Sequence, residues 1–298
     1  MAPIPKVVVG LDIGGTKLIA ASADAHGRVI KRDRAPTPRP LDMGLALLDE
    51  MIHAVTDGAP IASIGAAIGG PLNWATGVVC PLHQPEWRDV PLKALMEKKF
   101  QCPFSLDVDA NVAALAEYHH AEQKVPRLLY LTLSTGMGGG LVVDGQVYRG
   151  MNGEHPEVGH QSIPYRSAAG RTVACPCGSN GCLEALVSGS GIRRLYRKTP
   201  EELGKEEWEE VAWNLGQGLR NLAVIYLPDL IVVGGGVTFG ARETMLTPAI
   251  QIMREHLKIV QHPRVIATEL GEHNVLAGAI LLALRTAGPG LVGEENTL

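Results

Sequence analysis

Four potential metal ligands lie in the short segment from Glu154 to Glu184, and no other segment restricts the fold as strongly. They are one imidazole and three thiols, at His160, Cys175, Cys177 and Cys182. Three thiolates and one imidazole form a closed tetrahedral set for zinc, with no position left open for a substrate. The residues between Cys175 and Cys182 are turn-forming types, which favours a tight knuckle. We therefore expect a structural zinc ion that holds this loop in place.

The alternative is that these cysteines are ordinary reduced thiols or that two of them form a disulfide. A single residue separates Cys175 from Cys177, so a disulfide between them would close a small and strained ring. Three cysteines and one histidine at this spacing favour the metal. The remaining cysteines, Cys80 and Cys102, lie in unrelated segments and are expected to be buried thiols.

Two carboxylates are interleaved with the expected zinc ligands. Glu157 lies three residues before His160, and Glu184 lies two residues after Cys182. A metal that fixed the loop would also fix these carboxylates, and carboxylates accept hydrogen bonds from hydroxyl groups. The segment therefore predicts a loop that presents acceptors to a polyhydroxylated ligand.

The composition is that of an ordinary globular protein, with 46% hydrophobic and 19% charged residues in a chain of 298. That length predicts two domains or one large domain. The 35 glycines and the low aromatic content of 4% favour an α/β enzyme with many tight turns. The formal net charge of −4 gives no support for nucleic acid as a partner.

The sequence also predicts a protein that is neither inserted in a membrane nor exported. The apolar run from Val275 to Leu284 is too short to span a bilayer. The N-terminus lacks a basic region followed by a long apolar run, so no secretory signal is expected. Together with the odd number of cysteines and the expected thiolate zinc site, this indicates a reducing cytoplasm.

Two glycine-rich turns have the same design, in which an apolar strand precedes the turn and another strand follows it. The segment from Lys6 to Lys17 contains Asp12 and a Gly-Gly turn, and the strand from Arg127 to Leu133 runs into the turn from Ser134 to Gly140. Glycine amides can approach a phosphate closely, and Asp12 could hold Mg²⁺ directly or through water. The patterns of a P-loop and of a Rossmann turn are both absent. A simple hairpin is the alternative for the first turn.

Other segments alternate between strand and helix patterns. A strand from Ile61 to Ile68 ends in Gly69-Gly70-Pro71, at the carboxyl end where ligand sites of α/β proteins collect. A strand over Leu230 to Val233 leads into Gly234 to Val237, whose glycines would let an adenosine lie close to the backbone, with a plain β–α turn as the alternative. Helices are expected over residues 41–55, 90–100, 202–226 and 274–285.

Asp109 is the candidate catalytic base. The segment from Ser105 to Tyr118 begins as a short extended piece and places Asp109 at a strand–helix junction, where its carboxylate could accept a proton from a hydroxyl. Asp and Asn before a helix are commonly N-caps. Asp107 or Asn111 could serve as the cap and leave Asp109 for chemistry.

Taken together, these segments resemble the ROK family (repressors, open reading frames and sugar kinases) of the actin/hexokinase-like, ribonuclease H-like ATPase fold. The resemblance runs from Leu11 to Ala279, and its most specific part is the segment from Glu157 to Glu184. It implies a two-lobed α/β ATPase fold with a structural zinc loop. It also implies ATP-dependent phosphorylation of a hexose hydroxyl, with glucose, mannose or fructose as the sugar.

The resemblance assigns a role to each motif. The residues that would bind ATP and its phosphates are Asp12, Gly14, Gly15, Thr16, Lys17, Thr135, Gly136, Gly138, Gly234, Gly235 and Gly236. The residues that would contact the sugar are Gly70, Asn111, Glu157, His160 and Glu184. Asp109 would take the proton from the attacking hydroxyl, Mg²⁺ would accompany ATP, and His160 with the three cysteines would hold zinc.

Two departures from the family pattern leave the sugar open. Val108 replaces an asparagine that would contact a sugar hydroxyl, and His155-Pro156-Glu157 has the form seen in fructokinase-like members. The three-cysteine knuckle, in contrast, has the glucokinase and mannokinase form. An N-acetylhexosamine kinase and a non-catalytic, sugar-sensing ROK protein are the alternative functions. Because Asp12 comes so early, no room for an N-terminal DNA-binding domain is expected.

The expected architecture is two α/β lobes with a cleft that closes on the sugar. The smaller lobe would comprise residues 1–118 and 280–298, and the larger lobe residues 119–279. Because family members commonly dimerise, the resemblance also leaves a homodimer as an open assembly state.

Overall fold

The computed structural model describes residues 5–167, 170 and 172–288, and these form two compact units. The first consists of the described parts of Met1–Ala116, Arg149–Glu154 and His273–Leu298, and the second of Glu117–Tyr148 and His155–Glu272. The sequence-based boundaries differ from this division in three ways, the first being that the N-terminal segment ends at Ala116 rather than at residue 118. Residues 149–154 belong with the first unit, and its C-terminal part begins at residue 273 rather than 280.

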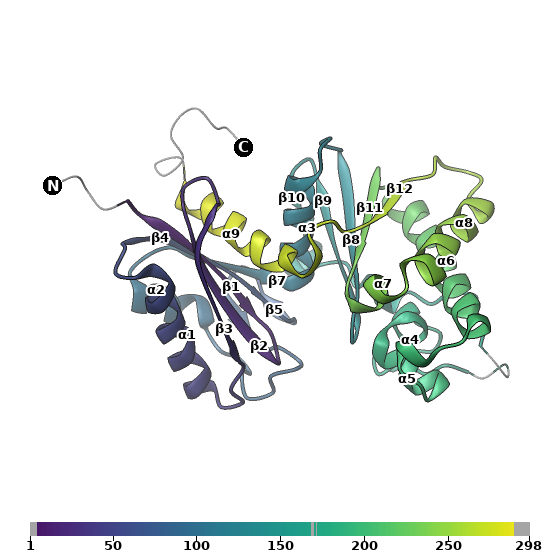
Figure 1. Cartoon of the computed structure of the whole chain (residues 1–298), viewed down its shortest axis with the longest axis horizontal. Coiled ribbons are helices and arrows are strands. Elements are labelled where there is room, and N and C mark those ends of the chain that lie inside the picture. Colours follow the sequence, from purple (N-terminus) through teal and green to yellow (C-terminus); the bar gives the residue numbers. More distant parts are fainter. Residues whose placement is uncertain (1–4, 168–169, 171, 289–298) are drawn as a thin grey trace. The chain divides into compact units, whose positions relative to one another are not determined.

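The first unit is built on a five-stranded mixed sheet with the order β3-β2-β1-β4-β7 (Figure 1). The strands are β1 (Val7–Ile13), β2 (Lys17–Ala23), β3 (Val29–Pro36), β4 (Ile61–Ile68) and β7 (Phe104–Val108). β2 pairs antiparallel with both β1 and β3, while β4 pairs parallel with both β1 and β7. A small hairpin of β5 (Leu72–Asn73) and β6 (Val78–Val79) follows β4.

Helices cover both faces of this sheet, because successive side chains of a strand point to opposite sides. Val9, Leu11 and Ile13 of β1 belong to the hydrophobic cluster that contains α1 (Leu41–Thr56) and α2 (Leu92–Phe100). Val8 belongs to the cluster formed with α9 (Asn274–Ala287), the yellow helix that crosses the sheet in Figure 1. The C-terminal helix therefore completes the core of the N-terminal sheet.

Glycine in β4 lets α9 approach the sheet closely. A Cβ on Gly65 would lie 2.2 Å from the carbonyl oxygen of Ala279 and 2.6 Å from the amide of Ala283, which are backbone atoms that cannot move aside cheaply. We expect Gly65→Ala to destabilise the protein by about 1–3 kcal/mol or more, the cost of overpacking a core. Gly69→Ala, where a Cβ meets nothing within 4 Å, is the matched control in thermal unfolding. Equal melting temperatures for the two variants would contradict this packing.

The second unit repeats the strand connectivity of the first. Its sheet has the order β10-β9-β8-β11-β12. The strands are β8 (Arg127–Leu133), β9 (Met137–Val143), β10 (Gln146–Val147), β11 (Leu230–Gly234) and β12 (Arg264–Ala267). β8, β9 and β10 pair antiparallel, and β11 pairs parallel with β8 and β12. The predicted repeat of strand, glycine-rich turn and strand is thus confirmed as β1–β2 and β8–β9.

A helical layer packs on the second sheet. Its helices are α4 (Leu183–Val187), α5 (Gly189–Tyr196), α6 (Lys205–Tyr226), α7 (Gly236–Gly240) and α8 (Thr247–His256), with a π-helical turn at Arg242–Leu246. Buried residues of α6, among them Val211, Leu215 and Leu219, share one hydrophobic cluster with Leu129, Leu131 and Leu133 of β8. The helical pattern predicted a start at Glu202, but Pro200–Glu202 is a separate 3-10 turn and α6 begins after Gly204.

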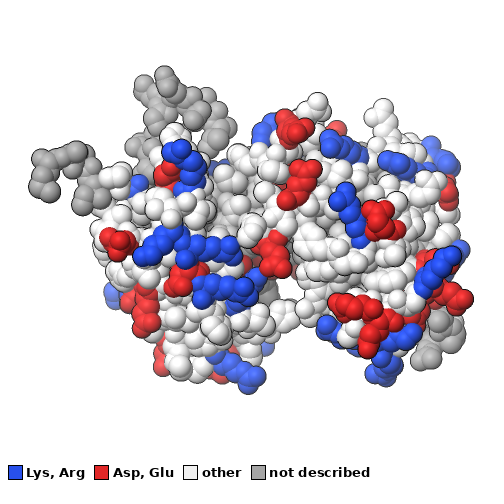
Figure 2. Space-filling model, viewed as in Figure 1, with Lys and Arg blue, Asp and Glu red and all other residues white. Residues whose placement is uncertain are grey.

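The remaining elements are short or link the units. α3 (Asp109–His120) begins in the first unit and ends in the second. The other 3-10 turns are Met151–Gly153, Val158–His160 and Gly271–His273. Among the described residues, none of the helices is long and apolar enough to cross a membrane. Basic and acidic side chains are interspersed on the face shown in Figure 2.

Candidate functional site

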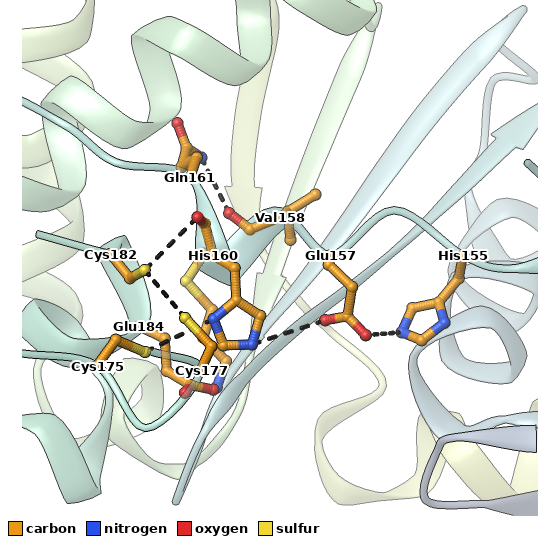
Figure 3. A network of polar contacts seen from close by, with 10 residues as sticks. His155, Glu157, Val158, His160, Gln161, Cys175, Cys177, Cys182 and Glu184 are labelled. Atoms are coloured by element: carbon orange, nitrogen blue, oxygen red, sulfur yellow. Dashed lines mark hydrogen bonds and ion pairs between the residues drawn. The ribbon is translucent and has the colours of Figure 1, made fainter. Parts of the chain in front are cut away.

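The four predicted zinc ligands converge in the second unit (Figure 3). Their ligand atoms all lie within 4.8 Å of one another. Nδ1 of His160 is 3.6 Å from Sγ of Cys175, and Sγ of Cys177 is 3.6 Å from Sγ of Cys182. Zinc bonds of about 2.3 Å to sulfur and 2.0 Å to nitrogen would place the corners of a tetrahedron roughly 3.5–3.8 Å apart. The residues therefore fit a tetrahedral metal ion.

The local backbone explains why these side chains meet. The amide of Cys175 donates to the carbonyl of Ser179, and the amide of Gly178 donates back to the carbonyl of Cys175. Gly178 has a φ of 95°, which is the left-handed region that favours glycine, so the knuckle depends on its turn residues. Burial and the neighbouring thiols raise the pKa of Cys182 to about 12. A bound cation would offset this cost of ionisation, because metal ligands bind as thiolates.

His160 can serve a metal and a ligand at the same time. Its Nδ1 faces the cysteines, while Nε2 lies 3.9 Å from Oε2 of Glu157 (Figure 3). The side chain of Glu157 is 62% exposed, and its other oxygen is 3.6 Å from Nε2 of His155. Of the residues predicted to bind sugar hydroxyls, His160 thus belongs to the metal cluster, and Glu157 lies beside it and is accessible to solvent.

Glu184 connects the metal loop to the second glycine-rich turn. Its Oε2 accepts a hydrogen bond from the amide of Met137 at 2.9 Å, and a Cβ on Gly136 would lie 2.9 Å from the same oxygen. The turn is also anchored by the amide of Gly189, which donates to the carbonyl of Ser134 at 2.8 Å. The sequence predicted Glu184 as an acceptor for a sugar but did not reveal this second contact.

The predicted adenosine element follows β11 directly. Gly235 has a φ of 94°, and a Cβ there would lie 2.2 Å from the carbonyl oxygen of Leu133, so only glycine fits. α7 begins at Gly236, where a Cβ would meet nothing within 4 Å. Gly236 therefore leaves open space beside the backbone, as a bound group would require.

In the first unit, the turn between β1 and β2 is a closed hairpin held from outside. The amide of Gly14 donates to the carbonyl of Lys17 at 3.0 Å, and the hydroxyl of Thr37 donates to the carbonyl of Gly14 at 2.6 Å. The amide of Thr37 also donates to the carbonyl of Thr16. These bonds fix the shape of the predicted phosphate loop.

Asp12 lies near the end of β1, and the pKa of its carboxyl group is raised. Burial and, to a smaller extent, the nearby Asp109 carboxylate raise its pKa to about 6, against the opposing charges of Lys17 and Arg32. Such a group is poorly solvated when ionised, and a divalent cation would relieve that cost. The two carboxylates predicted to act in catalysis are thus neighbours within one unit.

The raised pKa of Asp12 predicts that this residue lowers the stability of the folded protein at neutral pH. The folded protein binds this proton more tightly than the unfolded chain, so stability falls as the pH rises from about 4 through about 6. In magnesium-free buffer at pH 7.5, we expect Asp12→Asn to raise the free energy of unfolding by at most about 3 kcal/mol. The melting temperature should rise accordingly. The gain should vanish towards pH 4. A gain of equal size at both pH values would contradict the assignment.

Asp109 occupies the predicted junction, as the first residue of α3 directly after β7. It is exposed, and its Oδ1 accepts a hydrogen bond from the amide of Ala110 at 2.7 Å. Gly70, in contrast, has its carbonyl engaged by the amide of Leu82 at 3.0 Å. Asn111, predicted to contact the sugar, is buried and donates its Nδ2 to Oδ1 of Asp107 at 3.0 Å.

The second oxygen of Asp107 has a partner, Arg149, that the sequence did not predict. Nη2 of Arg149 reaches Oδ2 of Asp107, and the Arg149 guanidinium lies 4.1 Å from the centre of the Trp74 ring. The three residues are far apart in the sequence and belong to no motif, so no pattern could have joined them. All three lie in the first unit.

Known proteins of similar sequence are sugar kinases and repressors. A glucokinase of Halalkalibacterium halodurans is 30% identical over 321 aligned residues, covering 92% of this chain and 94% of that protein. A fructokinase of Zymomonas mobilis is 30% identical, covering 94% and 97%. A xylose repressor of Caldicellulosiruptor bescii is 26% identical, covering 93% of this chain and 78% of the repressor.

Solved structures of similar fold include ROK sugar kinases. A ROK hexokinase from Thermus thermophilus superimposes with a TM-score of 0.81 at 33% identity, over 93% of this chain and 97% of that one. A ROK glucokinase from Streptomyces griseus in complex with glucose and AMPPNP gives a TM-score of 0.75 at 27% identity, over 94% and 99%. The ROK family model itself matches residues 8–286. With the hexokinase-like α/β fold and the His/Cys cluster in place, this chain belongs to the ROK family.

Proposed function

We propose that the protein is a sugar kinase that transfers the γ-phosphoryl group of ATP to a hydroxyl of glucose, mannose or fructose. The observation that carries the proposal is the exposed carboxylate of Asp109 at the β7–α3 junction, in a chain whose relatives are named glucokinase and fructokinase. The sugar kinase class rests on these relatives, and the choice of hexose belongs to the proposal.

Asp109 acts as the general base. Its carboxylate accepts the proton from the sugar hydroxyl as the oxygen attacks the γ-phosphorus and the bond to ADP breaks. The exposed position gives the carboxylate access to a substrate, while the amide of Ala110 orients Oδ1. Positioning and electrostatic stabilisation then provide most of the remaining acceleration, as is usual for phosphoryl transfer.

The two glycine-rich turns would bind the phosphates of ATP, and Asp12 would hold the accompanying Mg²⁺. Amides of the Asp12–Lys17 turn, held in shape by Thr37, and those of the turn after β8 supply donors for phosphate oxygens. The buried carboxylate of Asp12 would hold the Mg²⁺ that accompanies ATP, and this ion would neutralise charge on the phosphates. Gly236, where a Cβ would meet nothing within 4 Å, leaves room for the nucleoside near the backbone.

The metal loop orients the sugar. His160 and the three cysteines would hold a structural zinc ion, and no substrate would bind to it because the ligand set is closed. Glu157 and Nε2 of His160 would accept and donate hydrogen bonds to sugar hydroxyls. The role of the metal is therefore to keep these groups in a fixed geometry.

A coupled assay of ADP release over a panel of hexoses and N-acetylhexosamines, with Mg²⁺-ATP, tests the proposal. We expect strong turnover with one or two hexoses and weak turnover with the acetylated sugars. Thermal stabilisation by a sugar without any turnover would instead show a sugar-binding protein that is not a kinase. The best sugar in the panel would also identify the substrate.

A further inference from the structure

A buried polar network in the first unit joins the start of α3 to a distant segment. Asp107, of which 3% is exposed, accepts hydrogen bonds from Nδ2 of Asn111 at Oδ1 and from Nη2 of Arg149 at Oδ2. Asn111 lies two residues after Asp109, and Arg149 enters the unit from the short segment Arg149–Glu154. One carboxylate thus fixes an amide and a guanidinium near the proposed general base.

The network is incomplete on both sides. Oδ1 of Asn111 and Nη1 of Arg149 are buried, and neither has a hydrogen-bond partner among the described residues. One of these atoms is an acceptor and the other a donor. Leaving a buried polar atom unpaired costs about 1–3 kcal/mol, so such atoms in a folded protein call for a partner. A group that both donates and accepts would satisfy the pair.

The surrounding residues point to a hydroxyl group. The Trp74 ring supports the Arg149 guanidinium at 4.1 Å and is itself 45% exposed. Val108, the residue before Asp109, is apolar and 4% exposed, so it offers no polar side-chain contact at this position. A carbonyl ligand could only accept and an ammonium could only donate, whereas an alcohol does both.

We propose that Arg149 and Asn111 together bind one hydroxyl of the sugar substrate, and that Arg149 determines which hexose is accepted. This inference rests on the proposed sugar kinase function and adds a specificity residue to it. The hydroxyl accepts a hydrogen bond from Nη1 of Arg149 and donates one to Oδ1 of Asn111. Asp107 is a positioning residue that holds both groups, and Asp109 remains the base for a different hydroxyl of the same sugar.

The test compares the best hexose with its monodeoxy analogues, in binding titrations on the full-length protein and on Arg149→Met. Methionine keeps an apolar stem against Trp74 but removes the donors. We expect one deoxy analogue to bind the unaltered protein about 10–100-fold more weakly than the parent sugar, as for loss of a charged hydrogen bond. In Arg149→Met the parent sugar should weaken by a similar factor, and the two sugars should then bind almost equally.

A second variant guards against misfolding, because Arg149→Met leaves the Asp107 charge buried without its partner. The double variant Asp107→Asn, Arg149→Met removes both charges and should show the same loss of discrimination at a near-normal melting temperature. If these folded variants keep the full set of deoxy penalties, the network is structural or holds only water, and the inference is wrong. If the unaltered protein binds none of the hexoses, the proposed function fails, and this inference fails with it.

Discussion

Replacing Asp109 with asparagine is expected to lower kcat by about 10²–10⁴-fold, the usual contribution of a positioned general base. Asparagine keeps the size of the side chain and an oxygen that can accept the Ala110 amide, so the start of α3 should remain intact. It cannot take the proton from the sugar hydroxyl. Sugar binding should therefore persist while turnover nearly disappears, and steady-state kinetics with parallel binding titrations would separate the two.

The control for this variant is Asp144→Asn, which makes the same chemical change at an exposed turn of the β9–β10 hairpin. Asp144 has a φ of 48°, a conformation that asparagine also tolerates. This control should retain full activity. Activity of Asp109→Asn above a few per cent of the unaltered enzyme would show that another group takes the proton.

The second large effect concerns the metal loop. We expect Cys182→Ser to lower the zinc content from about one ion per chain to nearly none and the melting temperature by roughly 10 °C, because metal binding and folding of a structural zinc site are coupled. Cys182 is fully buried directly before α4, so its loss also disturbs the helix that carries Glu184. The KM for the sugar should rise by about tenfold, as expected when two hydrogen bonds between the metal loop and the sugar are weakened.

Cys102→Ser is the matched control, since Cys102 is a half-buried thiol in the first unit, outside the His/Cys cluster. It should keep its zinc, its melting temperature and its KM. Metal analysis, thermal unfolding and kinetics on the same preparations would check all three. Verified loss of zinc from Cys182→Ser with unchanged melting and kinetics would remove the structural role of the metal.

The sequence was most informative where the chemistry is local. The four residues of the His/Cys cluster lie in one short segment with turn residues between them, and the glycine-rich turns lie directly between strands. Asp109 could be placed because the change from strand to helix pattern falls at that residue. Each of these features depends on neighbours in the chain, which a pattern can represent.

Features that depend on distant contacts could not be predicted. The pairing of Arg149 with Asp107 spans 42 positions and follows from tertiary packing alone. The same holds for residues 149–154, whose place in the first unit no sequence pattern indicates.

The most direct test of the central claim follows the phosphoryl group itself. Phosphorus NMR of a reaction containing Mg²⁺-ATP and the best hexose would identify the product. We predict a hexose phosphate that forms in equal amount to ADP, with its formation abolished in Asp109→Asn. ADP accompanied only by inorganic phosphate, or no consumption of ATP with any sugar, would contradict the assignment of this protein as a sugar kinase.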